Sequence, residues 1–275
     1  MKENLGKEVP RPPAFELDWR ENHQSALIFE KDPIRFAQIH LDFHPDEKQA
    51  ALLANPIHRG LLNCTRQWGK STVTAAKAVH QAIHKPGSLT LVISPSSRQS
   101  GEFLHKVAEF ISQLGIQTRG DGRNDISLKL PNGSRIIGLP GNENTIRGFS
   151  KVSLMLIDEA ARVSDEIYKT VRPMLAVGNG DLLMMSTPNG KRGFFHHEWA
   201  YGGDRWQRIE VPATECPRIP ADFLQEERET LGDSYFRQEY LCEFNEIEGA
   251  LFTEEMIQRA FRDDVKPLDI RRSER

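Results

Sequence analysis

Residues 60–72 of this chain read Gly60-Leu61-Leu62-Asn63-Cys64-Thr65-Arg66-Gln67-Trp68-Gly69-Lys70-Ser71-Thr72. The stretch begins as a short apolar strand, continues as a loop and leads into a helical pattern over residues 73–83. A phosphate loop needs this setting, because backbone N–H groups and the helix N-terminus then face the phosphates of a nucleotide. We expect Lys70 to reach the β and γ oxygens of ATP and Ser71 to bind Mg²⁺. The predicted ATP contacts of the loop are Thr65, Arg66, Gln67, Trp68, Gly69, Lys70, Ser71 and Thr72.

The loop departs from the pattern G-x-x-x-x-G-K-[ST] at its first position, where Cys64 replaces glycine. Only the second half of the pattern is present, and Gly-Lys-Ser alone is also typical of an ordinary helix start. The strand before the loop and the helix after it favour the phosphate-binding interpretation.

A second signal follows the apolar run at residues 152–157, which ends in Asp158-Glu159-Ala160. Two adjacent carboxylates at a strand end can place one beside Mg²⁺ and the next beside the attacking water. We expect Asp158 to hold the metal and Glu159 to act as the general base. The alternative is that the two acids merely end a strand.

A third signal is the polar turn Ser186-Thr187-Pro188-Asn189-Gly190, which follows an apolar run at residues 182–185. Open α/β sheets bind ligands at the carboxyl ends of their strands. We expect Ser186 and Thr187 to sense the γ-phosphate. The alternative is a β-turn in which these residues serve backbone geometry only.

Around these motifs, short apolar runs alternate with helical patterns. Strands are predicted at residues 60–64, 89–94, 152–157 and 181–186, and helices begin near Lys70, Arg98 and Ser164. A two-strand insert is predicted at 126–130 and 134–139, because Asn132-Gly133 is a strong hairpin signal. This alternation predicts an α/β P-loop NTPase fold with a mainly parallel central sheet flanked by helices, plus a small C-terminal helical subdomain or linker.

Three regions are expected along the chain. Residues 1–42 are rich in charge and proline, which indicates an arm or irregular lead-in. Residues 43–212 form the P-loop ATPase core, which starts with a helix from Pro45 to about Ala54. Residues 213–275 form a helical subdomain and linker, with helical patterns at 221–231 and 235–240.

The composition narrows the class of protein. A net charge of −3 and a pI near 6.3 are not typical of a nucleic-acid binder, because phosphate neutralisation usually needs a basic balance. Cys64, Cys216 and Cys242 lie far apart in the sequence, so neither a zinc site nor a disulfide framework is predicted. No apolar stretch approaches the ~20 residues of a membrane span, and the N-terminus has no signal core. We expect a soluble cytoplasmic protein without a membrane partner.

Taken together, residues 65–71 (TRQWGKS), 156–160 (LIDEA) and 186–190 (STPNG) resemble the ATPase domain of the large terminases of tailed bacteriophages. The resemblance covers roughly residues 43–252. An atypical first position of the phosphate loop is common in that family, so Cys64 supports the match.

The resemblance implies further roles for matching residues. Gln49 resembles a glutamine that reads adenine, although a surface glutamine on an amphipathic helix is an equal alternative. Arg66 resembles an arginine that stabilises charge on the γ-phosphate within the same subunit. Arg147 resembles an arginine that reaches the ATP of a neighbouring subunit in a ring, the alternative being a solvated loop arginine. Ser186 and Thr187 resemble the motif that couples hydrolysis to movement.

The resemblance also implies partners: double-stranded DNA, a portal protein, a small terminase subunit and other copies of the chain in a ring. The implied location is the host cytoplasm, transiently at the procapsid portal. Large terminases carry a second, ribonuclease H-like nuclease domain, but only about thirty residues follow Phe244. We therefore expect no nuclease site, and either a truncated form or a naturally split gene product.

Two other functions compete with a packaging ATPase. A helicase-like translocase of the same P-loop class would usually need a second motor domain of comparable size, which this length excludes unless another chain supplies it. A nucleotide-binding regulatory or scaffold module would not turn ATP over, and the pairing of Lys70 and Ser71 with Asp158 and Glu159 argues against it.

Overall fold

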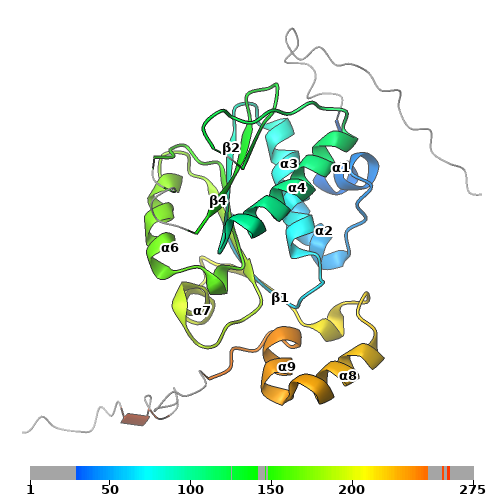
Figure 1. Ribbon diagram of the computed structural model, residues 1–275, viewed down its shortest axis with the longest axis vertical. Helices are drawn as coiled ribbons and strands as arrows, with labels where there is room; N and C mark the ends of the chain where they lie inside the picture. Colours follow the sequence, from blue (N-terminus) through cyan, green and yellow to red (C-terminus); the bar gives the residue numbers. More distant parts are fainter. Residues whose placement is uncertain are drawn as a thin grey trace, which may run out of the picture.

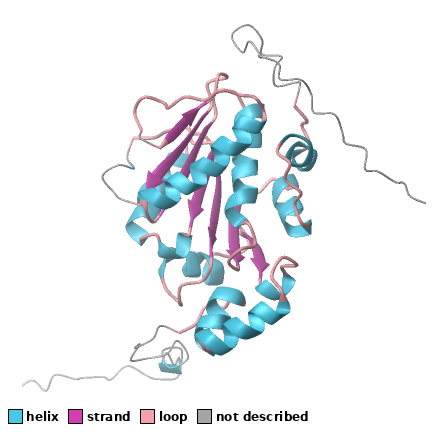
Figure 2. Ribbon diagram, turned by 45° about the vertical axis from the view of Figure 1, so that its right-hand side comes forward, coloured by secondary structure: helices cyan, strands magenta, loops and turns pink. Residues whose placement is uncertain are grey.

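The computed structural model describes residues 29–124, 126–141, 146, 148–246, 256 and 259–260. Seven strands in this part of the chain form one sheet in the order β3-β4-β2-β5-β6-β1-β7. Figure 2 shows the strands in magenta with helices packed around them. The strands are β1 (Arg59–Cys64), β2 (Leu89–Ser94), β3 (Ser127–Lys129), β4 (Arg135–Pro140), β5 (Leu154–Asp158), β6 (Asp181–Ser186) and β7 (Gln207–Val211). The β3–β4 pair is antiparallel and the other described pairs are parallel. The predicted fold class is confirmed.

The central strands are mostly apolar and are buried along almost their whole length, because helices cover both faces of the sheet. All residues of β2 and β5 are buried, and β1 and β6 are buried after their first residue. Parallel strands covered on both sides have this continuous apolar composition rather than an alternating one. The predicted runs at residues 89–94 and 181–186 coincide with β2 and β6, and those at 60–64 and 152–157 overlap β1 and β5.

The helices form one layer on each face of the sheet (Figure 1). On one face, α1 (Pro33–His40), α2 (Glu47–Ala54), α3 (Lys70–His84) and α4 (Ser97–Gln113) pack in one hydrophobic cluster. On the other face, α6 (Asp165–Val171) and α7 (Gly193–Tyr201) pack in a second cluster with the short helices η2 (Ala160–Arg162) and η3 (Arg172–Leu175). The sheet therefore lies between two apolar layers.

Side-chain caps fix where several of these helices begin. Asp46 and Gln49 form a capping box at the start of α2, with each side chain bonded to the backbone N–H of the other. Ser96 caps α4 and Ser164 caps α6 through bonds to backbone N–H groups.

Helix α1 was not predicted, since the charges and prolines of the N-terminal region indicated an irregular lead-in. Pro33 stands in the first turn, where a missing N–H costs nothing, and Asp32 caps the helix by accepting from Arg35 N at 2.8 Å. Phe36 is fully buried and its ring lies 5.1 Å from that of His80 on α3. Residues 33–40 are thus packed on the core.

The predicted hairpin forms, but it is not a separate insert. Strand β4 pairs in parallel with β2 along its length, so the hairpin extends the main sheet at one edge. Asn132 anchors the turn by donating to Ala82 O at 2.8 Å.

Two helices, α8 (Ala221–Leu231) and α9 (Asp233–Tyr240), follow β7 and the short helix η4 (Ala213–Glu215). Figure 1 shows them together at one end of the molecule, beyond β1. Their apolar contacts centre on a small cluster of Ala213, Phe236 and Tyr240. Within the described residues, no helix is both long and apolar enough to cross a membrane.

Candidate functional site

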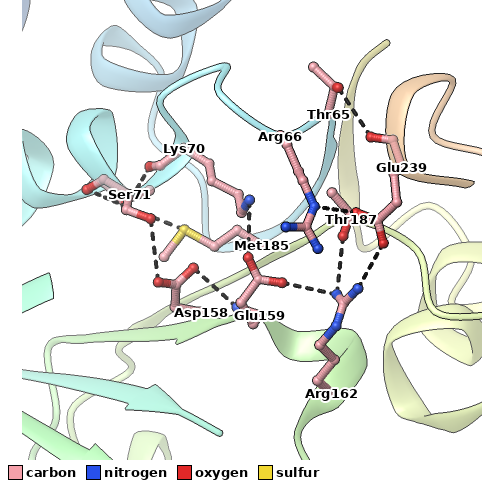
Figure 3. Close-up of polar contacts among 11 residues, drawn as sticks. Thr65, Arg66, Lys70, Ser71, Asp158, Glu159, Arg162, Met185, Thr187 and Glu239 are labelled. Atoms are coloured by element: carbon pink, nitrogen blue, oxygen red, sulfur yellow. Dashed lines mark hydrogen bonds and ion pairs between the residues drawn. The ribbon is translucent and has the colours of Figure 1, made fainter. Parts of the chain in front are cut away.

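The candidate site lies where β1, β6 and β5 end side by side. Asn63 of β1 pairs with Ser186 of β6, and Met185 of β6 pairs with Asp158 of β5. The register therefore brings the phosphate loop, the acidic pair and the polar turn to one edge of the sheet, as Figure 3 shows.

The loop between β1 and α3 has a backbone that favours glycine at its end. Gly69 has a φ of 93°, in the left-handed region, and a Cβ there would lie 3.1 Å from Gln49 Nε2. The carbonyl of Gly69 accepts from Thr72 N and Val73 N, each at 3.0 Å, which starts helix α3. A glycine is needed here both for its conformation and for the space.

Lys70 and Ser71 face the acidic pair. Lys70 Nζ lies 3.1 Å from Glu159 Oε1, and the lysine side chain is 11% exposed. Ser71 Oγ donates to Asp158 Oδ2 at 3.4 Å. The two motifs, distant in the sequence, meet in the structure as predicted.

Asp158 is a buried carboxylate that lies beside the hydroxyl of Ser71. Burial, and secondarily the charge of Glu159, raise the pKa of Asp158 to about 6, while Lys70 opposes this shift. The hydroxyl of Ser71 and the carboxylate of Asp158 are hard oxygen ligands of the kind that Mg²⁺ takes. These two residues fit the predicted metal site.

Glu159 has a strained backbone. Its φ of 50° and ψ of 44° lie in the left-handed region, which a residue with a Cβ rarely adopts. The turn is closed by Arg162 N, which donates to Glu159 O at 2.8 Å. The side chain of Glu159 lies against the phosphate loop, where its Oε1 contacts Lys70 Nζ.

Arg162 is a site residue that the sequence reasoning missed. Its Nη1 donates to Glu159 Oε2 at 3.0 Å and to Thr187 Oγ1 at 3.1 Å, and its Nη2 donates to Glu239 Oε1 at 3.0 Å (Figure 3). The available signal was an arginine three residues after Glu159, at the end of a short turn.

Glu239 of α9 is the second missed residue. Its carboxylate, 2% exposed, also accepts from Arg66 Nε at 2.6 Å, and its backbone carbonyl accepts from Thr65 Oγ1 at 3.2 Å. This pairing raises the pKa of Arg66. The loop arginine is therefore held by the C-terminal helices in this structure.

Gln49 is 1% exposed, so the surface alternative for this residue is wrong. Its Nε2 donates to Trp68 O at 2.8 Å, and its Oε1 accepts from Asp46 N at 3.0 Å. Trp68 O also accepts from Arg218 Nη2, and the indole of Trp68 is buried in the core. Gln49 thus supports the loop, and its contact with adenine stays a prediction.

The other predicted residues differ in exposure. Ser186 and Thr187 are buried; Thr187 accepts from Arg162, whereas Ser186 Oγ has no hydrogen-bond partner within the described part of the chain. Gln67 is exposed and Thr72 is half-buried. Arg147 lies outside the described residues.

Comparisons with known proteins point in one direction. Residues 61–259 match the family model described as "Terminase large subunit, T4likevirus-type, N-terminal". The large terminase subunit of Escherichia phage T5 is 29% identical over 220 residues, which cover 76% of this chain and 50% of that protein. The large terminase subunit of Thermus phage G20c is 23% identical, covering 78% of this chain and 51% of that protein. The chain spans about half the length of these curated relatives.

Solved structures share the fold. The ATPase domain of the large terminase of Thermus phage P74-26 has a TM-score of 0.68 at 22% identity, covering 76% of this chain and 97% of that one. The large terminase of another thermophilic bacteriophage, solved in complex with ADP, has a TM-score of 0.61 at 12% identity, covering 72% of this chain and 53% of that one.

Proposed function

The chain belongs to the terminase large-subunit family, and from that premise we propose that it hydrolyses ATP to drive double-stranded DNA into a viral procapsid. One observation carries the ATPase part of the proposal. The loop lysine contacts the predicted base, and both stand beside a hydroxyl and a carboxylate that suit Mg²⁺. Phosphoryl transfer to water requires this combination of cation, base and metal ligands.

In the proposed reaction, water attacks the γ-phosphorus and the bond from that atom to the β–γ bridging oxygen breaks, giving ADP and phosphate. Glu159 accepts the proton of the water. Lys70 and the loop N–H groups bind the β- and γ-phosphate oxygens, and Arg66 leaves Glu239 to stabilise charge on the γ-phosphate. Ser71 and Asp158 would hold Mg²⁺, which neutralises phosphate charge.

Two further findings support nucleotide binding. The large terminase solved with ADP, which shares the fold, has also been solved with ATP-γ-S. The phosphate-loop residues Thr65 to Thr72 lie at the carboxyl end of β1, the edge where open α/β sheets bind their ligands. Ser186 and Thr187, at the end of the neighbouring strand β6, would sense the γ-phosphate and couple hydrolysis to movement.

The partners follow from the family. We propose that the motor works as a ring of identical subunits with a portal protein and a small terminase subunit, in the host cytoplasm and transiently at the procapsid portal. Residues 43–212 would be the motor core, and residues 213–275 the helical subdomain and linker. Since the net charge is −3, contacts with DNA phosphates would come from local basic residues rather than from the overall charge.

The first test is the Lys70→Ala variant of the 275-residue chain. Removing the ammonium group should weaken Mg-ATP binding and abolish turnover, because the loop backbone stays but its point charge is lost. Binding is measured by calorimetry and turnover by phosphate release, with and without double-stranded DNA. Lys85→Ala, an exposed lysine just beyond the other end of α3, is the matched control and should behave like the parent. If both variants bind and hydrolyse like the parent, the phosphate loop has been misassigned.

The ring itself is tested through Arg147. An arginine that acts in trans stabilises charge that develops only in the transition state, and such residues contribute about 10³–10⁵-fold to the rate. Arg147→Ala should bind ATP like the parent and lose assembly-dependent turnover.

Assemblies that mix two variants make this test more specific. Glu159→Gln subunits still carry Arg147, so they should rescue Arg147→Ala subunits when the two are assembled together. Activity no greater than the sum of the separate variants, in assemblies where the parent is active, would give the trans role to another residue.

A further inference from the structure

We propose that Arg162 is a positioning residue for Glu159, an inference that rests on the proposed ATPase function. The guanidinium of Arg162 donates to Glu159 Oε2 at 3.0 Å. The other oxygen of the same carboxylate, Oε1, lies 3.1 Å from Lys70 Nζ. Both oxygens of the predicted base are thus held by cations in this structure.

Only one of these two contacts is compatible with ATP in the proposed site. Lys70 would bind the β- and γ-phosphates, so its contact with Glu159 must compete with the nucleotide. Arg162 approaches the carboxylate through its other oxygen, from the side of Thr187 and α9 (Figure 3). Arg162 is therefore the contact that can keep Glu159 oriented while Lys70 is engaged elsewhere.

Arg162 is itself fixed in place, as a positioning residue must be. Its Nη1 is shared with Thr187 Oγ1 at 3.1 Å, and its Nη2 donates to the buried carboxylate of Glu239 at 3.0 Å. It stands three residues after Glu159 in the short helix η2, so little backbone separates it from the base. A planar guanidinium can serve these three acceptors at once, whereas an ammonium group lacks the fixed fork.

The competing interpretation is a structural clamp that ties η2 to α9 through Glu239. A clamp and a positioning residue differ in what they change. Loss of a clamp lowers stability and lowers any remaining activity regardless of which side chain stands at position 159. Loss of a positioning residue lowers turnover only while the carboxylate that it positions is present.

The test compares Arg162→Gln and Arg162→Lys with Arg172→Gln in the full 275-residue chain. Arg172 is a matched control, because it also pairs with a buried glutamate, Glu198, and its side chain is 38% exposed against 29% for Arg162. We expect Arg162→Gln to lower kcat about 10- to 100-fold, the rate equivalent of one charge-assisted hydrogen bond. The Kd for Mg-ATP should change less than about threefold. Arg162→Lys should be intermediate in kcat, and Arg172→Gln should match the parent.

The deciding measurement is the same substitution in a Glu159→Gln background. Positioning predicts that Arg162→Gln then lowers the residual turnover by less than about twofold. Parent-like turnover of Arg162→Gln, or an equal loss in both backgrounds, would overturn the inference while leaving the ATPase proposal intact. A parent that does not hydrolyse ATP would overturn the proposed function and this inference with it, whereas a Glu159→Gln variant as active as the parent would remove Glu159 from the role of base and overturn this inference alone.

Discussion

Every residue of strand β5 is buried, whereas helix α8 has no buried residue. The sheet is held by apolar contacts on both faces. The C-terminal helices have a small apolar cluster, and the contacts that join the C-terminal segment to the site region are polar. Glu239 of α9 pairs with Arg66 and Arg162, and Arg218, just before α8, contacts Asp46 and Trp68. The free energy of apolar burial does not depend on nearby charge, whereas the strength of an ion pair beside the predicted phosphate site depends on the charge that is bound there. We therefore expect the sheet to stay rigid, whereas the contacts of the C-terminal helices change with the charge of the ligand in the site.

The largest expected effect separates chemistry from stability within the sheet region. Glu159→Gln should retain ATP binding and lower turnover roughly 10²–10⁴-fold, because the amide can still orient water but cannot accept its proton. The free energy of unfolding should change little, since Glu159 is partly exposed and lies at the end of the sheet. Calorimetry, phosphate release and urea unfolding are run on one preparation. Unchanged turnover would remove Glu159 from the role of base.

The next effect tests the apolar side of the comparison. Leu156 is fully buried in β5, and Leu156→Ala should lower the free energy of unfolding by about 2–5 kcal/mol through lost burial and a residual cavity. Leu231→Ala, at the exposed end of α8, is the control and should stay within about 0.5 kcal/mol of the parent. Urea unfolding measures both. Equal losses of stability would mean that apolar burial stabilises α8 as much as the sheet, which would contradict the difference proposed between the two regions.

The polar side is tested at Glu239. Glu239→Gln keeps the shape of the side chain but removes the charge that Arg66 and Arg162 share, and we expect a cost of about 1–3 kcal/mol. The loss should be local, so hydrogen exchange should accelerate in α9 while β5 stays protected. Uniform acceleration over both elements would show that the C-terminal helices and the sheet unfold as one unit.

The smallest effect is expected at the solvent-exposed contact between Arg218 and Asp46. Arg218 is 47% exposed and pairs with Asp46 at 3.1 Å, so Arg218→Gln should cost only about 0–1 kcal/mol and less at high salt. Thermal unfolding at low and high ionic strength measures this. A loss as large as that of Glu239→Gln would locate the main attachment of the C-terminal helices at Trp68 rather than at Arg66.

Local patterns were sufficient to predict the fold class. The runs at residues 89–94 and 181–186 were predicted with the bounds that β2 and β6 have, because continuous apolar runs between helical patterns are typical of buried parallel strands. The pairing of β4 with β2 was not predicted, since a hairpin signal fixes the turn and says nothing of the strand beside it. Helix α1 was also missed, because the effect of Pro33 depends on whether it stands inside a helix or in the first turn of one.

Only the site residues that belong to short sequence motifs could be predicted. Lys70, Ser71, Asp158 and Glu159 were found from their spacing to strands, and the structure brings them together. Arg162 and Glu239 belong to no such motif. Glu239 lies on a helix far along the chain, and only the docking of that helix brings its carboxylate to Arg66. Contacts made by tertiary docking have no local sequence signature.

The place of β1 in the sheet also has a consequence for synthesis. Within the described sheet, β1 pairs with β6 and β7, yet β1 ends at residue 64 and β6 begins at residue 181. At about 5–20 residues per second, roughly 6–23 s of translation separate the two strands. During that interval Leu61 and Leu62 have neither partner of the native sheet, so the nascent chain exposes an apolar segment while the ribosome works. We expect the phosphate loop, which connects β1 to α3, to reach its native conformation in one of the last steps of folding.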